Sequence, residues 1–190
     1  MSLVTSEKML LDAQAGSYAI GAFNTENMEL VKGIVAAAEE LQMPVMIGTT
    51  TAMIAYGSVE TYAAMIRAEA EKASVPVCLH LDHGVSYELA ETCVAHGYTS
   101  VMIDGSALPY EENIALSKKV SDMAAGRGVP TEAELGRIGG NEDHQGSAEI
   151  ECTSPDTAAD FVQRTGIFSL AVSIGTAHGI YKGEPKLNID

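Results

Sequence analysis

Positive charge is scarce in this 190-residue sequence, which has 11 lysines and arginines against 26 aspartates and glutamates and a formal net charge of -15. A nucleic-acid-binding surface needs clustered Lys and Arg to neutralise phosphate groups. The composition therefore argues against nucleic acid as a partner. It also means that any anionic ligand must be held by local devices such as backbone amides or a metal ion.

Cysteine and long apolar runs are scarce as well. The three cysteines, Cys78, Cys93 and Cys152, lie far apart and form no CxxC pair, which predicts reduced, buried thiols in a cytoplasmic protein. The N-terminus has no basic segment followed by an apolar one, and no apolar run approaches membrane-spanning length. A hydrophobic content of 46% over this length suits a single domain, 1–190, without a membrane partner.

The sequence shows no GxGxxG after its first apolar run, which disfavours a dinucleotide-binding fold. It also shows no antiparallel hairpin signal, which favours a parallel sheet. Short apolar runs instead alternate with amphipathic stretches, the pattern of βα units and a parallel sheet. Strands are predicted at 18–23, 45–48, 77–81, 100–103, 131–135 and 169–174. Helices are predicted at 6–15, 28–41, 58–70, 86–96, 109–126 and 155–166. The polar, glycine-rich segment 136–153 is predicted to be a mobile binding loop.

Polar residues end nearly every predicted strand. An open sheet concentrates its site at one switch point, whereas a (β/α)8 barrel gathers all strand ends into one ring. The distribution favours the barrel. After the sixth predicted strand the chain runs only to the segment 186–190, which leaves no room for two more strands, so either the sheet is open or the chain stops short of its own barrel. The strand-end residues are Asn24, Thr49, Asp82, His83, Asp104, Glu134 and, just past the last strand, His178.

The most informative stretch is HLDHG, which closes the apolar run at 75–79. Burying several titratable groups is costly unless they are paired or bind a metal, so His80, Asp82 and His83 indicate chemistry. His83 and His178 each precede a glycine and form a typical partial ligand set for zinc. The third ligand is not evident in these motifs. His80 shares its strand face with Asp82 and suits a supporting role that orients the site.

Each candidate also has a plainer interpretation. An isolated histidine is usually a surface or core residue, and Asp82 would then merely pair with a histidine. Glu132 and Glu134 share one face of a predicted strand, and at least one of them should point into the barrel. The plainer alternative is that they form a structural ion pair. Glu142 would ordinarily be a solvated surface charge. Because Gly139-Gly140 precede it, the loop could instead deliver this carboxylate to the site.

Four motifs together carry a family resemblance: HLDHG at 80–84, MIDGS at 102–106, EAELGRIGGNED at 132–143 and GTAHGIYK at 175–182. With AFN at 22–24, they run through essentially the whole chain in the right order. The sequence resembles the class II, zinc-dependent ketose-bisphosphate aldolases, which include the fructose-bisphosphate and tagatose-bisphosphate enzymes. GTAHG and EAELGR look slightly more like the tagatose branch.

The resemblance implies a (β/α)8 barrel that assembles as a homodimer or homotetramer. It implies that His83 and His178 are zinc ligands, that Asp82 is the general acid/base and that Glu142 is the loop carboxylate that handles the enediolate proton. Asp104 and Glu134 match positions that hold the metal in an alternative, resting site. The substrate-binding positions of the family are matched by Asn24, Gly179 and Lys182.

The resemblance also implies one catalytic zinc ion and allows a monovalent cation. The family's third zinc histidine and its phosphate loops belong to the last two strands, which do not occur in 1–190. The sequence is therefore expected to be a fragment of a longer enzyme.

The expected activity is reversible retro-aldol cleavage of a ketose 1,6-bisphosphate, fructose or tagatose, to dihydroxyacetone phosphate and glyceraldehyde 3-phosphate. A Schiff-base aldolase needs a lysine inside the barrel, and no predicted strand carries one. A second hypothesis is a non-catalytic barrel paralogue or partner subunit. The presence of Asp82, His83 and Glu142 together argues against it.

Overall fold

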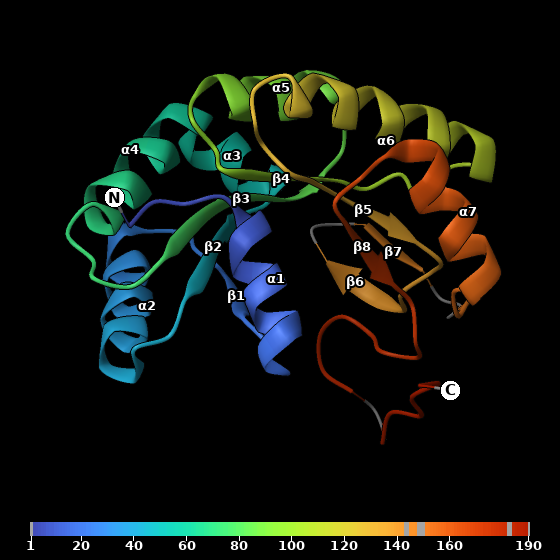
Figure 1. The fold of residues 1–190 in the computed structure, drawn as a ribbon, viewed down its shortest axis with the longest axis horizontal. Coiled ribbons are helices and arrows are strands. Elements are labelled where there is room, and N and C mark those ends of the chain that lie inside the picture. Colours follow the sequence, from blue (N-terminus) through green and yellow to red (C-terminus); the bar gives the residue numbers. More distant parts are fainter. Residues whose placement is uncertain (1, 143–144, 148–150, 182–183, 190) are drawn as a thin grey trace.

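The computed structural model describes residues 2–142, 145–147, 151–181 and 184–189; within 141–147 it describes the backbone alone. Its main feature is one six-stranded parallel sheet with the strand order β1-β2-β3-β4-β5-β8. The sheet curves into a half-barrel, with helices arranged around its convex side (Figure 1). The predicted α/β architecture, a barrel represented by about six βα units, is confirmed.

The strands of the main sheet follow one another in chain order across the half-barrel. This order is expected when each helical crossover returns the chain to the next position in a parallel sheet. The strands are β1 (Gly21–Asn24), β2 (Val45–Thr49), β3 (Val77–Gly84), β4 (Ser100–Ile103), β5 (Thr131–Leu135) and β8 (Ser169–Val172).

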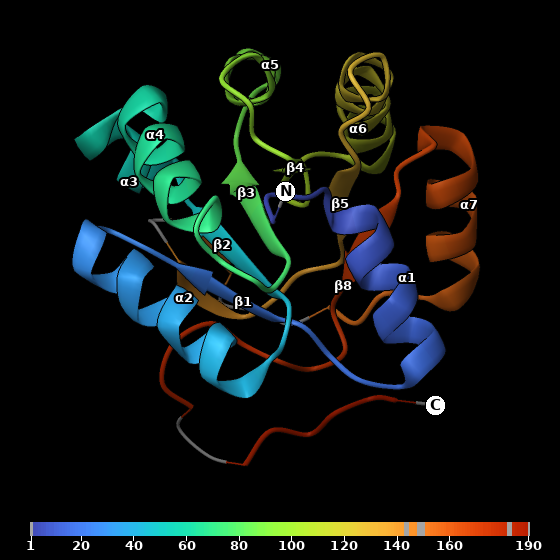
Figure 2. The ribbon, with the colours of Figure 1, turned by 60° about the vertical axis from the view of Figure 1, so that its left-hand side comes forward.

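Of the helices in the described part of the chain, six cover the convex side and a seventh lies on the concave side (Figures 1 and 2). The covering helices are α2 (Met28–Leu41), α3 (Thr51–Gly57), α4 (Val59–Ala70), α5 (Tyr87–Ala95), α6 (Tyr110–Ala125) and α7 (Pro155–Thr165). The seventh, α1 (Ser6–Gly16), packs its Met9 against Met46 of β2 and Cys78 of β3. It therefore covers the end of the sheet at which the strands begin.

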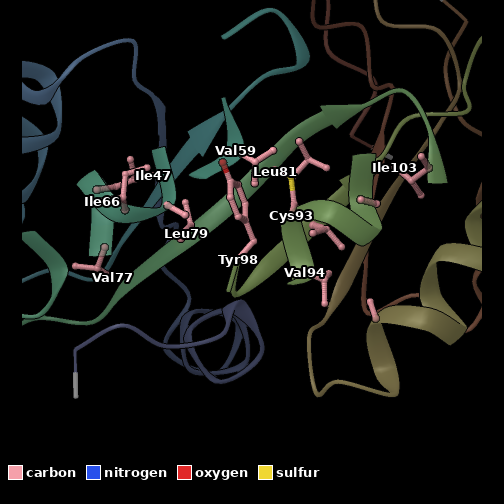
Figure 3. Close-up of a cluster of buried hydrophobic side chains, with 14 of the residues drawn as sticks. Ile47, Val59, Ile66, Val77, Leu79, Leu81, Cys93, Val94, Tyr98 and Ile103 are labelled. Atoms are coloured by element: carbon pink, nitrogen blue, oxygen red, sulfur yellow. The ribbon is translucent and has the colours of Figure 1, made fainter. Parts of the chain in front are cut away.

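The convex face of the sheet carries the main hydrophobic core. Odd-numbered residues of the central strands, such as Ile47, Leu79 and Ile103, are fully buried there against the helices (Figure 3). Successive side chains of a strand point to opposite faces, so the even-numbered residues face the concave side. Several of these are polar, including His80 and Glu134, each 4% exposed. The sheet thus has one apolar face and one face rich in titratable groups.

Two local elements were not predicted. The first is the helix Thr51–Gly57. Its cap is Thr50, whose hydroxyl accepts a hydrogen bond from the Met53 amide at 3.4 Å. In the sequence, the threonine at the start of this helix and the glycine at its end resemble ordinary turn residues. The segment expected as a loop contains a short antiparallel pair, β6 (Gly140–Glu142) and β7 (Gln145–Ser147). Strands of three polar or small residues leave no alternating apolar pattern from which they could be predicted.

The cysteines follow the prediction in part. Cys78 and Cys93 are buried free thiols, and burial raises the pKa of each to about 12, so both are inert at neutral pH. Cys152 is exposed, contrary to expectation; it lies between Glu151 and α7, outside any helix or strand of the described residues. Within the described residues, every helix is too short or too polar to cross a bilayer.

Candidate active site

An irregularity in β3 brings two of the predicted site residues together. Leu81 pairs with Val101 of β4 and Gly84 pairs with Ile103, so Asp82 and His83 oppose a single β4 residue. This two-against-one register is a β-bulge, and His83 has the left-handed φ of 46°. Strict alternation would place neighbouring side chains on opposite faces, whereas the bulge allows both to face the concave side. Strained backbone of this kind is characteristic of functional sites.

Contacts with β5 show that the bulge has this effect. Glu132 and Glu134 are two residues apart and share one face. His80 Nε2 lies 3.9 Å from a Glu132 carboxylate oxygen, and His83 Nδ1 lies 3.8 Å from Glu134 Oε2. Two histidines three residues apart in β3 therefore reach the same face of β5, which a regular strand would not permit.

Three side chains from consecutive strand ends form a cluster that could hold a metal ion: His83 of β3, Asp104 just after β4, and Glu134 of β5. His83 Nδ1 is hydrogen-bonded to Asp104 Oδ2 at 2.9 Å. One ligand atom from each of the three residues lies within 4.8 Å of the others. The sequence predicted all three as metal-site residues, and the sheet brings them together at its carboxyl edge.

Burial and mutual contact shift the pKa values of all three groups in this cluster. Burial, reinforced by the Asp104 charge, raises the pKa of Glu134 to about 7. Burial lowers the pKa of His83, but the hydrogen bond to Asp104 and the nearby carboxylates outweigh it and bring the pKa to about 9. For Asp104, burial is outweighed by the hydrogen bonds from His83 and Ser106, so its pKa is lowered.

Glu134 Oε2 is buried and has no hydrogen-bond partner among the described residues. A buried carboxylate oxygen without a partner is costly and needs an explanation. Zinc binds imidazole nitrogen and carboxylate oxygen at about 2.0–2.2 Å, so two ligand atoms of one ion lie within roughly 4 Å of each other. The separations of His83 Nδ1 from Asp104 Oδ2, 2.9 Å, and from Glu134 Oε2, 3.8 Å, satisfy this limit. One imidazole and two carboxylates are also ligand types that zinc binds.

Asp82 lies beside the cluster and has a partner on β1. The Asn24 amide donates a hydrogen bond to Asp82 Oδ2 at 2.8 Å. Gly48 of β2, between them in the sheet, makes room for this pair: a methyl group at Gly48 would overlap the Asn24 side-chain oxygen and lie 3.5 Å from the Asp82 β-carbon. The two side chains therefore occupy the space above a glycine, with Asp82 oriented by the amide.

His178 lies in the segment after β8 and reaches the same region. Its ring centroid is 5.3 Å from that of His83, in an edge-to-face arrangement with an interplanar angle of 76°. The His178 amide donates to the Gly139 carbonyl at 2.7 Å, so the segment that leads into β6 anchors it. Gly179 follows in an exposed, open position.

His80 lies deeper on the concave side and is 4% exposed. Its Nδ1 is hydrogen-bonded to the Ser100 hydroxyl at 2.9 Å, and Ser100 accepts from Ser6 of α1 at 3.1 Å. The other ring nitrogen faces Glu132, whose pKa is raised by burial. The residue predicted to support the site thus links α1 to the face on which Asp82 and Glu134 lie.

The sequence has two further histidines, His96 and His144. His96 directly follows α5, with its Nε2 3.2 Å from a Glu60 carboxylate oxygen, so it is not part of the cluster. His144 and Lys182 lie outside the described residues. For Glu142, the structure describes only the backbone, as the last residue of β6.

Sequence reasoning missed two contacts that shape the cluster. The Thr51 hydroxyl donates to the His83 carbonyl at 3.1 Å, which holds the bulged residue from the unpredicted helix α3. The Ser106 amide donates to Asp104 Oδ1 at 3.0 Å. Two sequence signals could have indicated these contacts. One is a threonine directly after the residue that caps a helix at the end of a strand, and the other is a DGS turn after a strand.

Comparison with known proteins supports a specific family. The family model described as "Fructose-bisphosphate aldolase class-II" matches residues 4–190. The chain is 44% identical over 190 residues to the fructose-bisphosphate aldolase of Geobacillus stearothermophilus, covering 98% of this chain and 66% of that one. It is also 44% identical to the Thermus caldophilus fructose-bisphosphate aldolase, covering 99% of this chain and 62% of that one.

The fold agrees with these relatives. The crystal structure of the YdjI aldolase from Escherichia coli K12 superposes with a TM-score of 0.87 at 42% identity, covering 98% of this chain and 66% of that chain. The present sequence therefore spans about two thirds of the length of the proteins it matches. With its half-barrel, its strand-end cluster and these similarities, the chain belongs to the class II fructose-bisphosphate aldolase family.

Proposed function

We propose that this chain provides most of the active site of a zinc-dependent aldolase that reversibly cleaves a ketose 1,6-bisphosphate to dihydroxyacetone phosphate and glyceraldehyde 3-phosphate. The observation that carries the proposal is the His83–Asp104–Glu134 cluster with Asp82 beside it. The substrate is a fructose or tagatose bisphosphate, because the matched relatives are named fructose-bisphosphate aldolases and the sequence motifs suit both sugars.

In this proposal His83 and His178 hold the catalytic zinc, and Asp104 and Glu134 offer it a second, resting position. The 5.3 Å separation of the two imidazole rings and the unpartnered Glu134 oxygen support this assignment. When bound, zinc supplies Lewis-acid polarisation of the ketose carbonyl. The remaining chemistry is proton transfer and positioning by side chains of this chain.

Asp82 is the base that accepts the C4 hydroxyl proton as the carbon–carbon bond breaks. The Asn24 amide holds one of its carboxylate oxygens, which leaves the other available to the substrate. Asn24 also lies at the end of β1, where it can contact the substrate directly. Glu142 returns a proton to the enediolate carbon, and Gly179 with Lys182 contacts a substrate phosphate.

The wider setting is proposed on the same basis: a cytoplasmic homodimer or homotetramer, with a monovalent cation as an additional ligand. The net charge of -15 makes a localised phosphate site necessary, because the protein as a whole repels a bisphosphate.

The test uses the full-length protein that contains these residues. Cleavage of fructose 1,6-bisphosphate and tagatose 1,6-bisphosphate is measured with a coupled assay for triose phosphates, before and after a chelator, and again after Zn²⁺ is restored. We expect activity that the chelator abolishes and Zn²⁺ restores, with one sugar preferred. A zinc-loaded protein that cleaves neither sugar would contradict the proposal and support the non-catalytic alternative.

A further inference from the structure

One asparagine reaches the metal cluster from the outside of the half-barrel. Asn113 lies in the first turn of α6 and is 2% exposed. An amide side chain buried this completely is costly unless its polar atoms are paired. Its nitrogen donates to the Glu134 carbonyl at 2.9 Å, and its oxygen accepts from the Ser117 hydroxyl at 3.0 Å.

The first of these bonds holds β5 at the point where its ladder with β4 ends, while β5 still pairs with β8 on its other side at Glu134. The last β4–β5 pair is Ile103 with Ala133, one residue before Glu134. Beyond that pair, Asn113 supplies a hydrogen bond to the β5 backbone in place of β4. The orientation of the Glu134 side chain, whose Oε2 lies 3.8 Å from His83 Nδ1, follows from the backbone that carries it.

The same side chain also packs against the residue that follows Asp104. A β-carbon on Gly105 would overlap the Asn113 side-chain oxygen and lie 2.9 Å from its amide carbon. Glycine at this position lets the amide lie directly against the turn after β4. Asn113 therefore touches the backbone beside both carboxylates of the cluster, and Ser117, fully buried one turn further along α6, fixes its orientation.

From these contacts we infer that Asn113 is a positioning residue that sets the geometry of the metal-binding carboxylates Asp104 and Glu134, with Ser117 as its anchor. The inference rests on the proposed function, since it requires that the cluster binds metal. Residues that orient metal ligands typically change metal affinity by about 10- to 100-fold when removed. Asn113 acts through the backbone of the ligands and makes no contact with the ion itself.

Helix α6 offers a matched control. Ser121, two turns beyond Asn113, is 6% exposed and donates to the Gly166 carbonyl at 3.0 Å. Its bond is also between a buried α6 side chain and a main-chain carbonyl, but Gly166 follows α7 and is remote from the cluster. Ser121→Ala therefore measures what the loss of such a bond does to stability alone.

The experiment compares Asn113→Ala, Ser117→Ala and Ser121→Ala in the full-length protein. Zn²⁺ affinity is measured by competition with a chromophoric chelator, the ligand field by the visible spectrum of the Co²⁺-loaded protein, and stability by thermal unfolding of the metal-free form. We expect about 10- to 100-fold weaker Zn²⁺ binding and an altered Co²⁺ spectrum for Asn113→Ala. Ser117→Ala should show a smaller loss, and Ser121→Ala should bind both ions as the parent does.

The outcomes distinguish failure of the proposed zinc-dependent function from failure of the positioning role of Asn113. If the parent binds no Zn²⁺, the proposed function fails. If the parent binds Zn²⁺ and Asn113→Ala binds it equally well, while melting earlier like Ser121→Ala, then Asn113 is merely structural and the inference is wrong. Should Asn113→Ala fail to fold, Ser117→Ala decides: unchanged Zn²⁺ affinity and Co²⁺ spectrum would overturn the positioning role.

Discussion

The two faces of the half-barrel differ in what their side chains do. On the convex face, residues such as Leu79 and Ile103 are fully buried in one hydrophobic cluster. The concave face of the sheet carries His80, Asp82 and Glu134; the charges of Asp104 and Glu132 lie near Glu134, and His80 Nε2 lies 3.9 Å from Glu132. Alternation along each strand lets one face provide stability while the other holds groups that would be unfavourable in a core. Mutations on the convex face should therefore lower mainly the stability, and mutations on the concave face mainly the activity.

The largest expected effect lies on the concave face. In the full-length protein, Asp82→Ala should lower kcat for aldol cleavage by about 10²- to 10⁴-fold, because it removes the group that we propose transfers the proton. Zinc content and melting temperature should change little, since the His83–Asp104–Glu134 cluster is intact. Steady-state kinetics and metal analysis check this. Activity within a few-fold of the parent would refute the role, and loss of zinc would make Asp82 a ligand.

Three residues earlier in β3, on the convex face, the expectation is reversed. Leu79 is fully buried, so Leu79→Ala should lower the free energy of unfolding by about 2–5 kcal/mol through lost burial and a cavity. The folded fraction should keep its Zn²⁺ affinity. Denaturant unfolding and metal titration measure both quantities. A variant as stable as the parent would show that this face is less tightly packed than its burial indicates.

A pH dependence should distinguish the metal-free protein from the metal-loaded one. The raised pKa of Glu134 means that its stabilising contribution is present below pH 4.5 and is lost as the pH rises through about 7. The raised pKa of His83 has the same sign: its contribution is present below pH 6.5 and is lost through about 9. Metal-free protein should therefore become less stable between pH 5 and 9.

Since one pKa unit corresponds to about 1.4 kcal/mol, the loss is on the order of 3–4 kcal/mol for each group. Urea midpoints measured across this range, with and without Zn²⁺, test the expectation. Glu134→Gln is the control, because it should remove the part of the slope below pH 7 and retain the part above it. A flat profile in the metal-free parent would contradict the charge arrangement of the cluster.

The smallest effect concerns the amide that orients Asp82. Asn24→Ala removes one hydrogen bond to a carboxylate at 2.8 Å, a contact worth about 1.5 kcal/mol or more, so kcat/KM should fall about tenfold. Asn24 is not in the metal cluster, and zinc content should be unchanged. An unaltered kcat/KM would mean that the substrate or the fold orients Asp82 without help from β1.

Much of the fold was predictable because its signals are local and strong. The strands at 100–103 and 131–135 were predicted to the residue. The first is a short, mostly apolar run after a glycine turn, and the second follows a proline and alternates glutamates with Thr, Ala and Leu, which is the two-residue period of a strand. Helix α3 and the β6–β7 pair were missed because neither has an apolar period of its own. Their placement depends on contacts with other segments, such as Thr51 with His83.

The sequence by itself determined that Asp82, His83, Asp104 and Glu134 end parallel strands, because alternating apolar runs fix where each strand stops. Tertiary structure alone decided that Asp82 and His83 share a face, since the bulge exists only in the register between β3 and β4. It also decided that Asn113, an ordinary helical residue in the sequence, lies against the Glu134 backbone. Side-chain periodicity is a property of one segment, whereas register shifts and contacts between segments arise only when the strands and helices pack together.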